Sequence, residues 1–267
     1  MTVRKGYVDT EDGQVHYRYG GDPSGEAPAI VCFHQNPSSS MMFEGVISEL
    51  RDDYFVVAPD MPGYGQSYDP DDVSSFSYYT RALTEAIDNV GVNDAHIVGH
   101  HTGAGVAVEL ATDAPDRTKS VTLIGPPYFS QEERERLLDE VYGDTPIPPL
   151  DEDGEYLLEH WEMFEGQDAS VEVKHEMLID ALVAREGTRK SVTVGRDQDL
   201  PTLFGSIEAP RLLMAARDDV LWDAFQRARE DHPDVPAVEI EGGDWEPLLD
   251  AQTVAAELES FLADQGY

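Results

Sequence analysis

A histidine stands between two glycines where an apolar, strand-like segment gives way to a helix-like one. The segment reads Gly99-His100-His101-Thr102-Gly103, so the residues two positions before and after His101 have no side chain. A sharp turn between strand and helix needs such small flanking residues, and it projects the central side chain above the sheet. Imidazole titrates near neutral pH and can accept a proton from water or from a substrate. We therefore interpret His101 as a candidate catalytic residue.

A carboxylate that could orient this imidazole occurs late in the chain. Asp218 and Asp219 follow closely on the apolar run at residues 211–215. If the loop that carries them lies beside His101, Asp219 would hold its ring in a dyad, with Asp218 as the alternative acid. A carboxylate in this role orients the ring and raises its basicity, so His101 would act as a general base, or else as a nucleophile itself.

The segments around these residues alternate between short apolar runs and helical periodicity. The runs are typical of strands buried on both faces of a parallel sheet. Expected strands lie at residues 5–9, 14–19, 29–33, 54–58, 95–99, 121–124, 211–215 and 237–240. Expected helices lie at residues 39–50, 79–90, 104–114, 223–230 and 251–262. This order predicts the α/β class, with an eight-stranded, mostly parallel sheet flanked by helices.

The alternation stops between the sixth and seventh expected strands. Helices are expected there at residues 131–141, 154–164, 171–185 and 199–204, with a proline-rich break at 144–149. We interpret residues 129–206 as a helical cap inserted after the sixth strand. Residues 1–128 and 207–267 would then form the core.

Five motifs, in order, resemble those of the α/β-hydrolase superfamily. They are FHQNP at residues 33–37, DMPGYGQS at 60–67, GHHTG at 99–103, RDD at 217–219 and GGDW at 242–245. The resemblance covers nearly the whole chain and implies the α/β-hydrolase fold. It also implies that GHHTG is the nucleophile elbow, that RDD carries the catalytic acid, and that GGDW replaces the segment with the catalytic histidine. By the same resemblance, the backbone N–H groups of Asn36 and Thr102 form an oxyanion hole, to which the Asn36 amide could add.

Two departures from that family pattern bear on function. His101 occupies the elbow position of a serine, aspartate or cysteine, and Trp245 falls where the family has its histidine. Shifting the alignment by one residue offers Asp244 or Glu246 instead, so the standard triad is absent. The chain is then either a cofactor-independent, hydrolase-like enzyme for a small organic substrate with a His101–Asp219 site, or an inactive pseudo-hydrolase that binds a small ligand or a protein partner.

Further residues are expected to line the substrate pocket by their positions in these motifs and in the cap. They are His34, Gln35, Tyr128, Trp161 and Trp245. The histidines show no metal-ligand spacing and no glycine-rich phosphate loop occurs, so neither a metal nor another cofactor is expected. The oligomeric state, monomer or homodimer, stays open.

The surface charge is strongly acidic. Asp and Glu number 54 against 18 Lys and Arg, for a net charge of −36. Such repulsion is screened in molar salt, where the Debye length is about 3 Å, so we expect a cytoplasmic protein of a high-salt organism. Binding to nucleic acid or to an anionic membrane is disfavoured, because basic residues are too few to neutralise phosphates. The apolar runs are too short to span a membrane, and the single cysteine, Cys32, excludes an internal disulfide.

Overall fold

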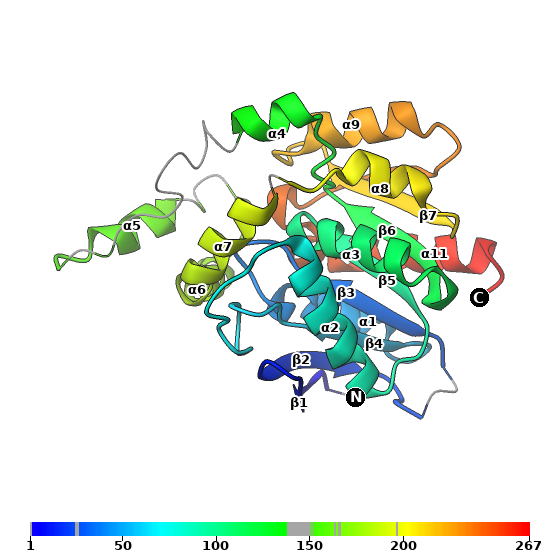
Figure 1. Ribbon diagram of the computed structural model, residues 1–267, viewed down its shortest axis with the longest axis horizontal. Coiled ribbons are helices and arrows are strands. Elements are labelled where there is room, and N and C mark those ends of the chain that lie inside the picture. Colours follow the sequence, from blue (N-terminus) through cyan, green and yellow to red (C-terminus); the bar gives the residue numbers. More distant parts are fainter. Residues whose placement is uncertain are drawn as a thin grey trace.

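The computed structural model describes residues 2–24, 27–137, 150, 152–162, 164, 167–195 and 197–267. Within these residues a single sheet of eight strands runs through the centre of the molecule, in the order β1-β2-β4-β3-β5-β6-β7-β8 (Figure 1). The strands are β1 Arg4–Asp9, β2 Gln14–Gly20, β3 Ala29–Phe33, β4 Phe55–Pro59, β5 Ala95–His100, β6 Thr118–Ile124, β7 Arg211–Ala216 and β8 Ala237–Ile240. The β1–β2 and β2–β4 pairs are antiparallel and all other pairs are parallel. The expected eight-stranded, mostly parallel sheet is confirmed.

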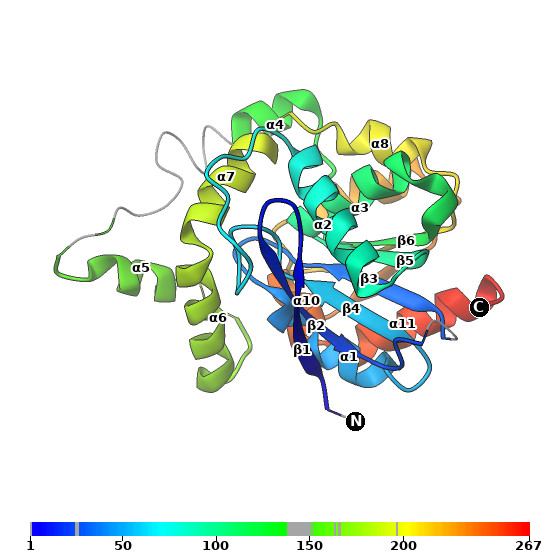
Figure 2. The same cartoon turned by 60° about the horizontal axis from the view of Figure 1, so that its bottom comes forward.

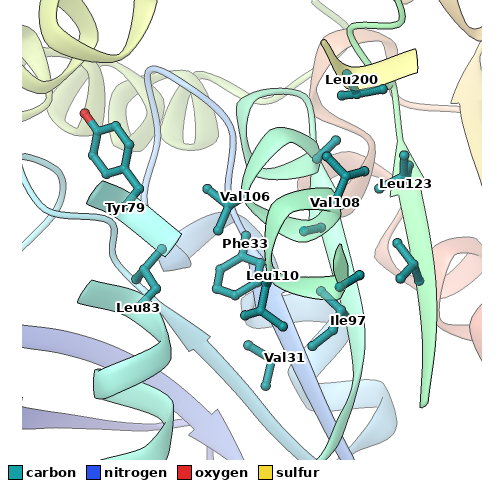
Figure 3. Packing of buried hydrophobic residues seen from close by; sticks show 14 of the residues in the cluster. Val31, Phe33, Tyr79, Leu83, Ile97, Val106, Val108, Leu110, Leu123 and Leu200 are labelled. Atoms are coloured by element: carbon teal, nitrogen blue, oxygen red, sulfur yellow. The ribbon is translucent and has the colours of Figure 1, made fainter. Parts of the chain in front are cut away.

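Successive side chains of the central strands enter two different cores. In β3, Val31 and Phe33 belong to one apolar cluster, whereas Ile30 and Cys32 belong to the other. This two-residue alternation buries both faces of the strand, which explains why its sequence is continuously apolar. Figure 3 shows part of the first cluster, where Phe33 packs near Val106 and Leu110.

Helices cover both faces of the sheet. Figure 2 shows α2 and α3 on one side, with α1 and α11 on the other. The bounds are η1 Ser40–Phe43, α1 Glu44–Leu50, α2 Phe76–Val90, α3 Thr102–Asp113, η2 Pro115–Arg117, α9 Trp222–Asp231, η4 Gly243–Trp245, α10 Glu246–Leu249 and α11 Ala251–Asp264. Apart from the short additions η2, η4 and α10, these elements match the helices expected from periodicity. The one difference in kind is that residues 39–50 begin as a 3₁₀ turn.

Five helices of the described chain lie between β6 and β7. They are α4 Gln131–Leu137, α5 Glu155–Glu162, α6 Val171–Val183, α7 Arg185–Gly195 and α8 Leu200–Ser206. The expected helix at residues 171–185 ends at Val183, and α7 was not expected because Gly187 and a run of β-branched residues lower its helix propensity. Residues 138–149 of the expected helix and proline-rich break lie outside the described residues. In both views α5 projects from the body (Figures 1 and 2), whereas α8 buries Leu200 and Phe204 in the core.

Helix α7 packs closely on the loop that follows β4. A β-carbon on Gly187 would lie 2.4 Å from the carbonyl oxygen of Gly63, so only glycine permits this approach. The Tyr64 hydroxyl donates to Ser191 Oγ at 2.7 Å, one turn further along α7. These contacts fix α7 beside the carboxyl ends of the strands.

The loops that carry the five motifs all follow carboxyl ends of strands. Because β3 to β8 run parallel, these ends meet at one edge of the sheet, where ligands bind in open α/β sheets. No helix among the described residues is long and apolar enough to cross a bilayer.

Candidate active site

The turn between β5 and α3 has the backbone geometry of a strained elbow. His101 has φ 46° and ψ −111°, and among the described residues it is the one non-glycine with a positive φ. A β-carbon on Gly99 would lie 2.4 Å from Gly103 O, and one on Gly103 would lie 2.1 Å from Phe33 O. Both glycines are therefore required sterically, as the motif predicts. Such strain at a non-glycine residue is typical of functional sites.

The elbow directs the imidazole of His101 at the acid loop after β7. His101 Nε2 lies 3.1 Å from Asp219 Oδ2, while Asp219 Oδ1 accepts from the backbone N–H of Leu221 at 2.6 Å. Asp219 is 4% exposed and His101 is 8% exposed. Burial alone would raise the pKa of Asp219, but the charge and hydrogen bond of His101 and the Leu221 amide lower it. Asp219 is therefore the acid that the structure brings to His101, and Asp218 is not.

This contact defines the proton arrangement on the ring. An ionised Asp219 can only accept, so Nε2 carries a hydrogen in this contact, and in the neutral form of the ring Nδ1 keeps its lone pair. Nδ1 of His101 makes no hydrogen bond to any described residue. The ring thus has a free basic nitrogen opposite the nitrogen that the carboxylate holds.

A second buried pair lies beneath the first. His100 Nε2 lies 2.8 Å from Glu246 Oε2, and both side chains are fully buried. Glu246 Oε1 accepts from the Ala216 amide at 3.1 Å. Burial and the neighbouring charge of Asp219 raise the pKa of Glu246 well above its usual range, whereas burial lowers that of His100 well below its own. These shifts favour the uncharged forms of Glu246 and His100 and the charged form of Asp219.

His100, His101 and Glu246 also form a group with metal-binding side chains. One ligand atom from each lies within 4.8 Å of the others. Adjacent histidines and a glutamate 145 positions later have no recognisable metal spacing, so this grouping was not expected from the sequence. One nitrogen of each ring already holds a hydrogen bond, Nε2 of His100 with Glu246 and Nε2 of His101 with Asp219.

Asn36 and Thr102 lie beside His101 at the same cavity. Thr102 begins α3, so its N–H is one of the first-turn donors that have no partner within the helix. Asn36 Oδ1 accepts from the Thr188 hydroxyl of α7 at 2.5 Å, which leaves its amide nitrogen as a donor. The N-terminus of α3 favours negative charge at this point.

The cavity has a volume of about 220 Å³. This volume is below the ~300–1,000 Å³ typical of pockets for drug-sized ligands, so it suits a small molecule. Its walls come from the strand-end loops, α2, α4, α7 and α8. The lining residues are Asn36, Phe76, His101, Thr102, Pro127, Phe129, Arg134, Ser191, Gly195, Gln198, Leu200, Val220 and Leu221.

The two expected pocket residues near β3, His34 and Gln35, do not line this cavity. His34 is fully buried, and its Nδ1 donates to Gln35 O at 2.7 Å. Its Nε2 accepts from the Met61 amide at 2.9 Å. The ring therefore ties two loops together and has no nitrogen left for a ligand. Gln35 is 2% exposed and does not line the cavity either.

The three aromatic residues expected in the pocket also lie elsewhere. Tyr128 points its hydroxyl at Asp231 Oδ2 and His232 Nε2, at 3.1 and 3.2 Å, while its neighbours Pro127 and Phe129 line the cavity. Trp245 packs edge-on against Phe164 at 5.7 Å between ring centroids. Trp161 belongs to the projecting α5 and is not among the lining residues (Figure 2).

Several site residues were not identified from the sequence. Phe76, Ser191 and Gln198 line the cavity from α2, α7 and the segment before α8. No feature of the sequence marked these residues, because a helical pattern does not indicate which helix face contacts a distant loop. Gly125 does have a sequence signal, because it begins the Gly-Pro-Pro turn after β6. Its φ is +50°, a value that favours glycine.

The strand order, the elbow geometry and the position of the acid loop point to one family. Residues 28–193, more than half of the chain, match the family model described as alpha/beta hydrolase fold. The chain belongs to the α/β-hydrolase fold family.

Solved α/β-hydrolase-fold structures superpose over almost the whole chain. A putative lipase from Acinetobacter baumannii AYE has a TM-score of 0.80 at 18% identity, with 98% of this chain and 91% of that chain covered. The enol-lactonase from Burkholderia xenovorans LB400 has a TM-score of 0.76 at 18% identity, with 97% and 100% covered. Likeness at this identity concerns the fold.

Curated relatives match this α/β-hydrolase chain over a shorter stretch. The dihydrolipoyllysine-residue acetyltransferase component of an acetoin cleaving system from Cupriavidus necator is 41% identical over 123 residues, which are 46% of this chain and 32% of the relative. Haloalkane dehalogenase 2 from Mycobacterium tuberculosis is 31% identical over 121 residues, 44% of this chain and 40% of the relative. The match thus spans 32% and 40% of the lengths of these two relatives.

Proposed function

We propose that this α/β-hydrolase-fold chain is a cofactor-independent, hydrolase-like enzyme in which His101, held by Asp219, is the general base. The observation that carries the proposal is the orientation of one ring. Nε2 of His101 faces the buried carboxylate of Asp219, and the residue lines a small cavity together with Thr102 and Asn36. A base, its orienting acid and two donors for an oxyanion then surround one reacting carbonyl group.

The hydrolysis of an ester or lactone would proceed as follows. Nδ1 of His101 takes a proton from a water molecule while the water oxygen bonds to the carbonyl carbon. The carbonyl oxygen becomes an oxyanion that the Thr102 amide and the Asn36 donors stabilise. Asp219 stabilises the imidazolium that forms. When the tetrahedral intermediate collapses, the C–O bond breaks and the imidazolium returns the proton to the leaving alkoxide.

The rate enhancements expected from these groups are sufficient for an enzyme without a covalent nucleophile. General base catalysis contributes roughly 10²- to 10⁴-fold, and one oxyanion donor contributes about 10²- to 10³-fold. Both groups are held by the fold before substrate arrives: the first by the elbow and Asp219, the second by α3 and the Thr188 contact. The hydrolase names among the relatives agree with this class of reaction without indicating a substrate.

The test is a substrate screen in molar KCl across small esters and lactones. For any substrate turned over, His101→Ala and Asp219→Asn should each lower kcat by at least 100-fold. The asparagine keeps the volume but can present its amide N–H to Nε2, which would move the ring proton to Nδ1 and remove the base. His175→Ala, which removes an exposed histidine on α6, is the matched control and should be neutral. Unchanged turnover in His101→Ala would refute the proposal.

A ligand-binding pseudo-hydrolase is the second candidate, and the buried carboxyl at Glu246 is the observation that favours it. Glu246 begins α10 near the position where the family pattern has its histidine, and it is a fully buried carboxyl with a raised pKa and not an imidazole base. Inactivity across the screen, together with a measurable affinity of the same compounds for the cavity, would favour this role.

A further inference from the structure

A basic side chain lines the cavity, although basic residues are few in this protein. Arg134 of α4 is the one Lys or Arg among the residues lining the cavity in the described part of the chain, and no Asp or Glu lines it. The chain has 18 basic residues against 54 acidic ones. A guanidinium inside a cavity without acidic lining residues creates a local positive potential, opposite in sign to that of the surface.

Arg134 is only partly neutralised by its own neighbours. Its NH1 group donates to Phe129 O at 3.0 Å and lies 3.7 Å from Asp199 Oδ1. The Asp199 side chain is 55% exposed, and its oxygens also accept from the amide and hydroxyl of Thr202. The ion pair is therefore long and half in solvent, which makes it weak.

The Nε group of the guanidinium has no hydrogen-bond partner among the described residues. The side chain of Arg134 is 12% exposed, and its buried Nε has no hydrogen-bond partner. An unpaired buried donor carries a free-energy cost that an acceptor would remove. The planar guanidinium is a fork of donors that suits the two oxygens of a carboxylate.

The rest of the cavity wall is mainly apolar. Phe76, Phe129, Leu200 and Leu221 contribute to it, and His101 lines another part of the same space. A ligand that satisfied all of these groups would have an apolar body, a carboxylate at one end and the reacting group at the other. The volume of about 220 Å³ limits it to a small molecule.

We propose that Arg134 binds the carboxylate of a small monoanionic substrate whose apolar body lies against Phe76, Phe129 and Leu200. As a statement about substrate, this inference rests on the proposed function, but the binding site itself does not require catalysis. A substrate held at both ends would place its ester or lactone at His101 with little loss of freedom, which is how remote binding groups assist a reaction.

The first experiment measures binding of 4-phenylbutanoate and of its neutral counterpart 4-phenylbutanamide by calorimetry in 2 M KCl. It uses His101→Ala protein, so that the result does not depend on activity. The carboxylate should bind at least 10-fold more tightly than the amide. Arg134→Gln should reduce this preference to within 2-fold, Arg134→Lys should keep part of it, and Arg136→Gln, which removes a neighbouring exposed charge of α4, should keep all of it. Equal affinities for the two compounds, or a preference that survives in Arg134→Gln, would overturn the assignment.

The second experiment uses active protein and compares monomethyl pimelate with dimethyl pimelate. The monoester should have the lower KM, and Arg134→Gln should raise that KM at least 10-fold while leaving the KM of the diester within 2-fold. Turnover without this difference in KM would overturn the role of Arg134, but it would not count against the role of His101 as the base. Carboxylate binding without any turnover would support the role of Arg134 in binding and count against the proposed function.

Discussion

Gly125 leaves the space that the carboxylate of Asp219 occupies. A β-carbon at this position would lie 2.3 Å from Asp219 Oδ2 and 2.5 Å from both Cδ2 and Nε2 of His101. Its φ of +50° is itself unfavourable for other residues. We expect Gly125→Ala to separate the dyad and to lower turnover by at least 100-fold, as measured by steady-state kinetics.

A matched variant distinguishes this steric effect from backbone strain. Gly91 ends α2 with φ +100°, and a β-carbon there would meet nothing within 4 Å. Gly91→Ala should cost about 1 kcal/mol of unfolding free energy and leave turnover unchanged. Full activity in Gly125→Ala would mean that the His101–Asp219 contact is dispensable.

The raised pKa of Glu246 predicts how the protein tolerates substitution there. Glutamine keeps the shape and lacks charge, so Glu246→Gln should cost less than about 1.5 kcal/mol at pH 6. Glu246→Leu leaves the Ala216 amide and His100 Nε2 unpaired and should cost roughly 3–5 kcal/mol. Urea unfolding in molar KCl measures both values.

The same residue should impose a pH dependence. Because the folded-state pKa is raised, the folded protein binds more protons than the unfolded chain above the usual pKa of 4.5. Wild-type stability should therefore fall relative to Glu246→Gln as pH rises from 5 toward the raised pKa. A difference that is constant from pH 5 to 8 would indicate an ionised Glu246.

His96 should give stability the opposite pH dependence, so that the protein loses stability as the pH falls. Burial, followed by the charge of Lys119, lowers its pKa to about 4, and its Nδ1 lies 2.9 Å from Ser120 Oγ. The unfolded chain takes up a proton near pH 6.5 and the folded protein only near 4, so stability is lost as pH falls between these values. The loss should reach about 3 kcal/mol by pH 4. Replacement by glutamine should remove it, as seen by comparing unfolding curves of the two proteins at pH 7 and pH 4.5.

The adaptation to salt that the charge predicts is testable by thermal unfolding. With a net charge of −36, we expect Tm to rise steeply between 0.1 and 3 M KCl as the repulsion is screened. Sucrose at matched osmolality stabilises by exclusion without screening charge, so it should raise Tm much less. Equal effects of the two solutes would contradict a high-salt adaptation.

The sequence predicted the sheet well because burial on both faces imposes a simple rule. Residues 29–33 are apolar throughout, and the structure places alternate side chains in two cores. The meeting of His101 with Asp219 was predictable for a related reason, since both follow carboxyl ends of parallel strands.

Side-chain direction within the loops and the helices between β6 and β7 was much less predictable. Tyr128 and Phe129 are neighbours, yet the tyrosine turns toward α9 and the phenylalanine lines the cavity. Their direction depends on partners such as His232, which lie more than 100 residues away. Arg134 reaches the cavity because of how α4 is oriented on the core, which no local pattern records.

The pair formed by His101 and Asp219 has a consequence for how relatives are compared. In the family pattern the acid after β7 faces an imidazole from the loop after β8, where this chain has Asp244, Trp245 and Glu246. Here the imidazole that faces the acid comes from the elbow. An imidazole therefore faces the acid from a different position in the chain. Position-by-position transfer of roles would therefore report a lost histidine, whereas superposition of functional groups would recover it.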